Sequence, residues 1–249
     1  MPQFNSDILT EFPGGGHYGF SGARVEKLEA NEYTLVTIVL DESGSTNSFR
    51  NEMIACIKAL LGASKKGPRA DFVLFRLVNF AERVKEFHGF LPLEQCHLAN
   101  YDNCYGGHGL GGATALYDAV ENAVRSTNAY AKILADQDFD VNSLTFIITD
   151  GNDNNSASGV NEVKTAFDAS VSEEALESSV NLLIGVNVKQ AHISKFLNDF
   201  NKDAGFNDYI EIENANEQTL SKLAGWGSSY ISSQSQALGS GGPSQSLVF

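Results

Sequence analysis

Three side chains with oxygen donors stand two residues apart in the segment Asp41-Glu42-Ser43-Gly44-Ser45. The segment follows an apolar run, residues 33–40, which is rich in β-branched residues and typical of a strand buried on both faces of a parallel sheet. The Asp41 carboxylate is therefore expected at the carboxyl end of a central strand, where open α/β sheets bind their ligands. One carboxylate and two hydroxyls on a tight loop can converge on a hard cation, and Mg²⁺ prefers such oxygen ligands.

Two further segments, far along the chain, fit the same site. Thr114 follows a glycine turn, Gly111-Gly112-Ala113, and comes just before a predicted helix. Asp150 follows a second buried strand, residues 144–149. A small site rich in hydroxyls favours Mg²⁺ by size, and Mn²⁺ and Ca²⁺, which also seek hard oxygen ligands, are the alternatives. The predicted metal ligands are Asp41, Ser43, Ser45, Thr114 and Asp150.

The order and types of these residues resemble those of the von Willebrand factor A domain family and its metal-ion-dependent adhesion site. The resemblance covers roughly residues 33–232, and all five motif positions hold the residue types that the family uses. It implies that the two serines and the threonine coordinate the metal directly or in alternation with the aspartates, which often act through water. It also implies that a carboxylate from a protein partner fills the open position on the metal.

Strands that alternate with helices predict a doubly wound, mostly parallel sheet with helices on both faces, of the von Willebrand factor A or Rossmann-like type. The link Ala81-Glu82 is too short for a parallel crossover, so the strand at 83–90 is predicted to be antiparallel and to form an edge of the sheet. Helices are expected near 48–63, after Thr114, and at 159–177, 189–204 and 216–232. The six expected strands are 33–40, 71–80, 83–90, 144–149, 179–186 and 207–212.

Composition divides the chain into three parts: a glycine-rich arm at 1–32, the domain at 33–232 and a tail at 233–249. The tail is rich in Ser, Gln and Gly and is predicted to be flexible, because such a sequence cannot bury enough apolar surface to fold alone. The arm is expected to be a partly ordered extension, or to pack through its aromatic side chains on the domain or on a partner. The last three residues, Leu247-Val248-Phe249, form either an apolar docking tip or a free terminus.

The length of 249 residues, of which 42% are hydrophobic, suits one well-filled domain with appendages. A formal charge of −14 argues against nucleic-acid binding, which needs a basic face. The N-terminus does not read as a signal peptide, and no apolar stretch approaches the ~20 residues that span a bilayer. The sequence has three cysteines, an odd count, and Cys56 falls on the apolar face of a predicted helix. A reducing cytoplasmic location is therefore expected.

Two segments allow other metal sites. The long connection at 91–113 holds Cys96, His97, Cys104 and His108, which could bind zinc, although their spacing matches no common zinc finger. We expect this connection to be a surface loop that borders the metal site and contributes to partner specificity.

The loop at 150–156 is crowded with oxygen donors, but Asn161 stands where a calcium loop has its glutamate. Asp150 is therefore interpreted as the metal residue of this loop. Asp153 is interpreted as a solvated or outer-shell group.

The favoured function is a non-enzymatic, metal-dependent binding module that recognises a partner carboxylate. By analogy with cytosolic relatives of the family, one candidate partner is an AAA+ ATPase of the MoxR or chelatase kind, with this chain as the adaptor to a client. One alternative is a structural subunit in which the metal only rigidifies loops. The other is a Mg²⁺-dependent hydrolase with Asp41 as nucleophile, which is disfavoured because Ser43 occupies the place of a second aspartate and no Lys or His base is evident.

Overall fold

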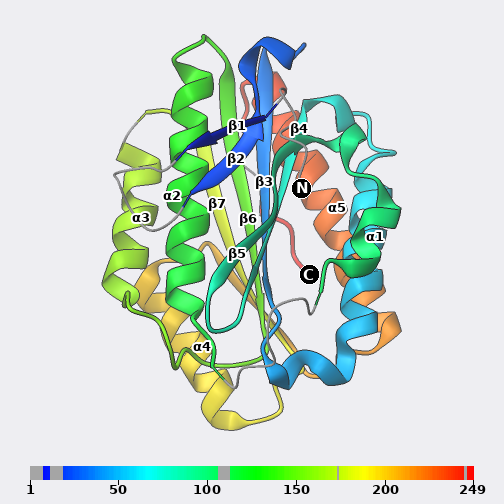
Figure 1. Ribbon diagram of the computed structural model, residues 1–249, viewed down its shortest axis with the longest axis vertical. Helices are drawn as coiled ribbons and strands as arrows, with labels where there is room; N and C mark the ends of the chain where they lie inside the picture. The colour runs from blue at the N-terminus through cyan, green and yellow to red at the C-terminus, as the bar shows by residue number, and fades with distance from the viewer. Residues whose placement is uncertain (1–7, 12–18, 106–112, 173, 244–245) are drawn as a thin grey trace, which may run out of the picture.

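The computed structural model describes residues 8–11, 19–105, 113–172, 174–243 and 246–249. Within these residues, eight strands form one sheet in the order β1-β2-β5-β4-β3-β6-β7-β8 (Figure 1). The strands are β1 (Ile8–Glu11), β2 (Phe20–Ala23), β3 (Glu32–Asp41), β4 (Val73–Phe80), β5 (Val84–Pro92), β6 (Asp140–Thr149), β7 (Ser178–Val186) and β8 (Asp208–Ile212). The helices are α1 (Arg50–Ser64), α2 (Leu116–Ala135), α3 (Val160–Ser172), α4 (Ala191–Ala204) and α5 (Glu217–Ser240).

The centre of the sheet is the parallel pair β3 and β6. Strand β3 is buried along nearly its whole length and pairs in parallel with both β4 and β6, and β7 and β8 continue the parallel order. Helices α1 and α5 cover one face, and α2, α3 and α4 cover the other (Figure 1). The predicted doubly wound, mostly parallel fold is confirmed. None of the helices in the described segments combines the length and apolarity that crossing a membrane requires.

Two expectations about the sheet were wrong: it has eight strands rather than six, and β5 is not an edge strand. Strand β5 is antiparallel to β4, as expected, but β2 pairs with its other side in parallel, at Gly22 and Phe90. The backbones approach closely there, because a Cβ added to Gly89 would lie 1.9 Å from the Ser21 carbonyl oxygen. The added strands are only four residues long and lie in a glycine-rich segment, so their sequence carries little period-2 signal.

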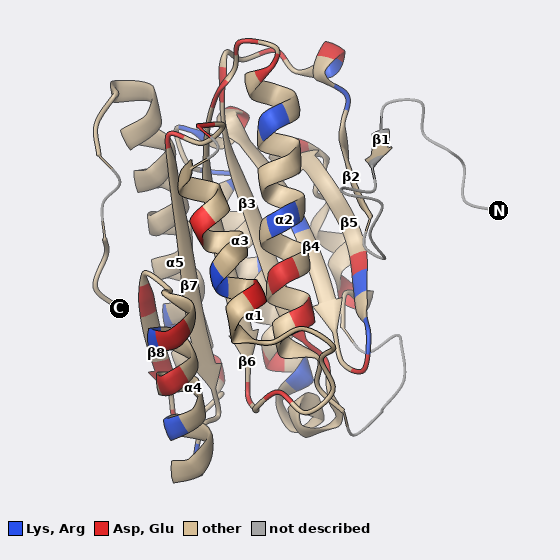
Figure 2. Cartoon of the chain, turned by 90° about the vertical axis from the view of Figure 1, so that its left-hand side faces the viewer, with Lys and Arg blue, Asp and Glu red and all other residues tan. Residues whose placement is uncertain are grey.

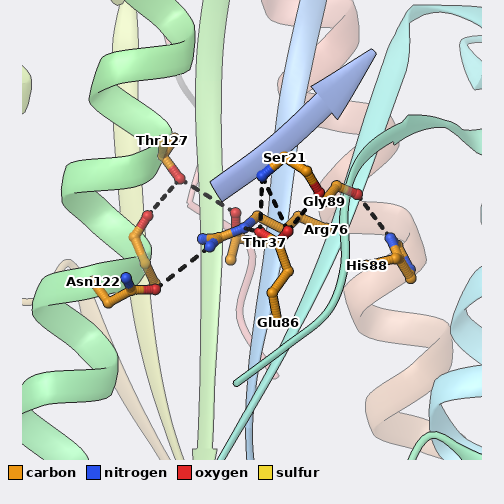
Figure 3. A network of polar contacts seen from close by, with 9 residues as sticks. Ser21, Thr37, Arg76, Glu86, His88, Gly89, Asn122 and Thr127 are labelled. Atoms are coloured by element: carbon orange, nitrogen blue, oxygen red, sulfur yellow. Dashed lines mark hydrogen bonds and ion pairs between the residues drawn. The ribbon is translucent and has the colours of Figure 1, made fainter. Parts of the chain in front are cut away.

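A buried ion pair fastens β2 to the sheet (Figure 3). The Arg76 side chain is fully buried on β4, and its Nε donates to Glu86 Oε2 at 2.7 Å. Glu86 Oε1 accepts from both the backbone N–H and the hydroxyl of Ser21, at 3.0 and 2.5 Å. Burial lowers the pKa of Arg76, and the charge of Glu86 opposes that shift. A single carboxylate therefore compensates a buried cation and holds the added strand in place.

We predict that Glu86→Ala lowers the free energy of unfolding by about 3–5 kcal/mol, because it leaves the Arg76 guanidinium buried without an anionic partner. The double variant Arg76→Met/Glu86→Leu is expected to recover most of the loss, since replacing both charges with apolar groups is often nearly neutral. Urea denaturation of the three proteins measures both values. A double variant no more stable than Glu86→Ala would contradict the ion-pair explanation.

The connection after β5 differs from the predicted surface loop. Its first part forms 3₁₀ turns at Leu93–Gln95 and Leu98–Asn103. The side chains of Cys96, Tyr101 and Cys104 are buried in the core beside α1. Apolar and aromatic residues in this segment therefore decide its position. The remainder, residues 106–112, lies outside the described residues, as does His108 of the zinc alternative.

Helix α5 continues past the expected end at 232 and reaches Ser240, into the segment for which composition predicts a flexible tail. Gln234 and Ser235 are fully buried, and the Gln234 carbonyl oxygen accepts from Asn142 Nδ2 at 2.9 Å. Beyond the helix, the Leu247 carbonyl oxygen accepts from Trp226 Nε1 at 3.1 Å. The described end of the chain thus packs on α5.

Candidate metal centre

The two predicted aspartates lie next to each other because their strands are neighbours. Asp41 is the last residue of β3 and Asp150 directly follows the last residue of β6. Leu40 pairs with Ile148, so the two strands end in register. Since adjacent strands lie about 4.8 Å apart, both carboxylates come to the same small region at the carboxyl edge of the sheet.

Both oxygens of the Asp41 carboxylate are hydrogen-bonded and the side chain is only 2% exposed. Oδ1 accepts from the backbone N–H of Ser43 at 2.8 Å, which closes the turn after β3. Oδ2 accepts from the hydroxyl of Thr149 at 2.6 Å. Sequence reasoning missed Thr149, although its position as the last strand residue before Asp150 was a usable signal. Asp41 is therefore held in one orientation by the loop that follows β3 and by the last residue of β6.

The two serines connect Asp41's loop to Asp150. The hydroxyls of Ser43 and Ser45 lie 3.1 Å apart. Ser45 Oγ donates to Asp150 Oδ1 at 2.7 Å. The side-chain oxygens of Ser43, Ser45 and Asp150 thus form one continuous series of contacts. The Asp41 carboxylate is joined to this series through the N–H of Ser43.

A third segment, just before α2, carries Thr114. This residue is buried and lines the same cavity as Ser43, Ser45 and Asp150. Its backbone is bonded to Asn154 on both sides: the Thr114 N–H donates to Asn154 Oδ1 at 2.7 Å, and Asn154 N–H donates to the Thr114 carbonyl at 3.0 Å. These bonds fasten the loop that carries Thr114 to the loop that carries Asp150. Asn154 is a second positioning residue that the sequence did not reveal.

Asp153 has a different role from the one expected. Its Oδ1 accepts from the N–H groups of Leu116 and Tyr117, at 2.8 and 3.3 Å, and so caps the N-terminus of α2. In addition, Asp118 on α2 accepts a hydrogen bond from the N–H of Ser158, which lies in the same loop as Asp153, at 2.8 Å. Asp153 is thus a half-buried cap of α2. It fixes the helix that begins two residues after Thr114.

The electrostatics of the centre are unfavourable without a cation. Burial raises the pKa of Asp150 to about 6, and the negative charge of Asp41 adds to the increase, while the hydrogen bond from Ser45 opposes it. Burial also raises the pKa of Asp41 against the hydrogen bonds from Thr149 and Ser43. Two carboxylates therefore share a region in which their charges repel each other and are incompletely solvated.

A cavity of about 540 Å³ opens over these groups. Besides the metal-site residues, its lining contains the amide side chains of Asn152, Asn187 and Gln190 and one cation, Lys189. The lining includes no histidine or cysteine among the residues that the structure describes. In those same residues, no group of three or more His, Cys, Asp or Glu side chains is arranged to hold a metal ion. A metal here would depend on hydroxyl ligands beside two carboxylates.

That donor set fits a hard divalent cation. The oxygens of Ser43, Ser45 and Asp150 already lie in contact, and a cation would offset the burial and the charge of Asp41, which together raise the pKa of Asp150. The zinc alternative does not fit the structure, because its cysteines, Cys96 and Cys104, are buried in the core on the α1 side of the sheet. For the hydrolase alternative, the ionisable side chains that line the cavity, among the residues that the structure describes, are Lys189 and Asp150, which is itself a predicted metal ligand.

A family model described as von Willebrand factor type A domain matches residues 36–225. No curated protein sequence matches the chain.

Several solved structures share the fold. The PilB minor pilin from Streptococcus sanguinis has a TM-score of 0.56 at 16% identity, over 89% of this chain and 66% of its own. The pilus adhesin SpaC from Lactobacillus rhamnosus GG has a TM-score of 0.61 at 11% identity, over 87% and 32%. Proximal thread matrix protein 1 from the mussel byssus, with a zinc-occupied MIDAS motif, has a TM-score of 0.50 at 16% identity, over 82% and 46%. The chain thus spans less than two thirds of the length of each of these proteins, and at such identities the likeness shows the fold alone.

We predict that the metal-free chain loses stability as the pH rises from about 4 to about 6. Asp150 has a pKa of about 6 in the folded state against 3.8 as its ordinary value, so the folded state binds more protons in that window and is favoured at its acidic end. Asp150→Asn is expected to remove most of this dependence and to melt a few degrees higher than the unsubstituted chain above pH 6 in EDTA.

Thermal unfolding across this pH range, in EDTA, measures the effect, with the exposed Asp203→Asn as the matched control. Equal pH profiles for the unsubstituted chain and Asp150→Asn would contradict the raised pKa of Asp150 that burial and the charge of Asp41 cause.

Proposed function

We propose that this chain, which belongs to the von Willebrand factor type A domain family, is a protein-binding module whose contact with its partner is completed by a divalent metal ion. Asp41, Ser43, Ser45, Thr114 and Asp150 hold the ion, with Mg²⁺ preferred and Mn²⁺ or Ca²⁺ as alternatives. The aspartates supply the negative charge, and the three hydroxyls supply neutral oxygen ligands. Domains of this family are usually non-catalytic binding modules.

The observation that carries the proposal is the series of contacts from Ser43 through Ser45 to Asp150 in the lining of an open cavity, with the buried Asp41 carboxylate hydrogen-bonded to the N–H of Ser43. No cation of the described chain forms an ion pair with Asp41 or Asp150. The site therefore carries uncompensated negative charge that a divalent ion compensates. With only two carboxylates, the ion keeps positive charge toward solvent and attracts an anionic ligand.

A carboxylate is the ligand that suits this exposed position. The chain has a formal charge of −14, so an acidic partner is repelled at long range and must be recognised locally. The metal supplies that local attraction, and Lys189 on the rim adds a second positive charge. The amide side chains around the cavity are suited to hydrogen bonds with the partner's backbone. Because Mg²⁺ gives up water reluctantly, the surrounding surface must contribute part of the affinity.

Two of the structural neighbours support a binding role of this kind. SpaC is a pilus adhesin, and proximal thread matrix protein 1 has been seen with zinc in its MIDAS motif. The AAA+ ATPase partner and the cytoplasmic location stay predictions from the sequence.

We predict that Asp41→Ala and Thr114→Ala each weaken Mg²⁺ binding by about tenfold or more, while the fold persists. Both residues lie at the edge of the sheet, outside the packed apolar clusters. Thr114→Ser keeps the hydroxyl and is the matched control, with an affinity close to that of the unsubstituted chain. Isothermal titration calorimetry gives the affinity, and circular dichroism in EDTA checks the fold. Unchanged Mg²⁺ affinity in both alanine variants would overturn the ligand assignment.

Partner binding is expected to require both the metal and Asp41. A pull-down from the host with the unsubstituted chain and with Asp41→Ala, each in Mg²⁺ and in EDTA, tests this requirement. A protein captured by the unsubstituted chain in Mg²⁺, and lost both with the substitution and with EDTA, supports recognition through the metal. A partner retained in all four conditions would leave the metal the structural role of the alternative hypothesis.

A further inference from the structure

A second cavity, of about 970 Å³, opens at the end of the sheet opposite the metal centre. Its lining includes Glu32 and Asp140, the first residues of β3 and β6, whereas the metal residues lie at the last residues of the same strands. A ten-residue strand at about 3.3 Å per residue separates the two cavities by roughly 30 Å. In Figure 2 this end is uppermost, and its loops carry several Asp and Glu positions. The cavity is thus a distinct site, independent of the metal ligands.

The base of this cavity is apolar and fixed. Tyr33 and Leu93 are buried beneath it, and Leu28, Phe72 and Pro92 are half-buried in its walls. The Tyr33 hydroxyl accepts from the N–H groups of Glu29 and Ala30, both at 3.0 Å, which holds the turn before β3. The apolar surface is therefore already formed in the absence of a ligand.

The rim is acidic. The exposed side chains of Glu29, Asp71, Glu94 and Asp140 form no ion pair within the residues that the structure describes. Glu32 differs, because Arg69 pairs with it. The lining also holds Lys27 and Lys65, and the ammonium group of Lys65 donates to the backbone carbonyl of Glu94 at 3.1 Å. Carboxylates thus outnumber ammonium groups on the lining, and four of them point their charge at solvent.

We propose that this cavity binds a basic, partly apolar segment of a protein partner. Lysine or arginine side chains of that segment pair with the rim carboxylates, and an apolar side chain fills the space above Tyr33 and Leu93. Charge complementarity and the apolar base act together. An acidic rim alone attracts any cation, whereas the apolar base adds affinity for a ligand that also brings an apolar anchor. The cavity is not a metal site, since its described carboxylates do not converge to hold an ion.

Two sites of opposite preference at opposite ends of one sheet allow the chain to bridge two partners. The metal end takes an anionic group, and the acidic cavity takes a cationic one. Because about 30 Å of packed sheet lies between them, both partners can be bound at once without steric conflict. This inference does not depend on the proposed metal-dependent function, since it uses none of the metal ligands.

The experiment uses short fluorescent peptides and the full chain, with binding followed by fluorescence anisotropy in EDTA and again in Mg²⁺. One peptide alternates Lys and Leu, a second replaces Leu with Gln, and a third replaces Lys with Glu. The Lys–Leu peptide is expected to bind, the Lys–Gln peptide to bind at least several-fold more weakly, and the Glu–Leu peptide not to bind. Affinity for the Lys–Leu peptide is expected to be the same with and without Mg²⁺.

The double variant Asp71→Asn/Glu94→Gln is expected to weaken binding of the Lys–Leu peptide by about tenfold, because two rim charges are removed. Asp203→Asn/Glu213→Gln is the matched control, since it changes the net charge equally at exposed residues that do not line the cavity. Equal loss in both variants would show general attraction to an acidic protein and overturn the proposal. So would equal binding of the Lys–Leu and Lys–Gln peptides, or no binding of the Lys–Leu peptide. Loss of binding in Asp41→Ala would place the peptide at the metal end instead.

Discussion

The structure depends on one electrostatic constraint: two carboxylates, Asp41 and Asp150, end two adjacent parallel strands at the centre of the sheet. Parallel pairing of β3 and β6 brings the strand ends together whether or not the charges there are compatible. Burial and mutual repulsion raise the pKa of Asp150 to about 6, so the metal-free centre is destabilised near neutral pH. A divalent cation bound there, as proposed, would offset this effect. The centre is therefore best understood as a site whose unfavourable charge in the free state favours binding of a cation.

Much of the surrounding polar structure serves to hold this centre in shape. Thr149 fixes the orientation of the Asp41 carboxylate, and Asn154 fixes the backbone of Thr114. Asp153 caps α2, and Asp118 on that helix accepts from the loop after Asp153 in return. The loop after β6 is thus cross-linked by hydrogen bonds both to α2 and to the backbone of Thr114. Such a scaffold allows ligands from three separate segments to keep the small distances that a hard cation requires.

The two ends of the sheet differ in what they offer a partner. The carboxyl end of the parallel strands collects hydroxyl and carboxylate oxygens around a candidate cation. The opposite end has a larger cavity with an apolar base and exposed carboxylates. In a strongly acidic chain, the local charge at each end, rather than the net charge, would select the proposed ligands. The added strands β1 and β2 enlarge the sheet on the side where β5 would otherwise be exposed, and the Glu86 carboxylate links them to the buried Arg76.

The sequence by itself determined the fold class and the composition of the candidate site. Apolar runs ending in Asp41 and before Asp150 predicted central parallel strands, and helical periodicity predicted the covering helices, because both signals are local. The short link at Ala81-Glu82 likewise predicted the antiparallel β5. The strands that extend the sheet beyond β5 could not be predicted from the sequence. Phe20–Ala23 is a short strand whose pairing depends on contacts with residues far away in the chain.

Only the tertiary structure decided which polar groups support the site and where the chain's ends pack. Asp153 and Asn154 look like loop residues in the sequence, and their roles depend on bonds to residues about forty positions earlier. The segment at 233–240 has the composition of a flexible tail, yet Gln234 and Ser235 are fully buried at the end of α5. The acidic cavity also has no sequence motif, because its lining comes from separate turns that meet only in the folded chain. Local patterns encode strands, helices and ligand types, whereas long-range packing decides which polar groups face one another and which surfaces remain open.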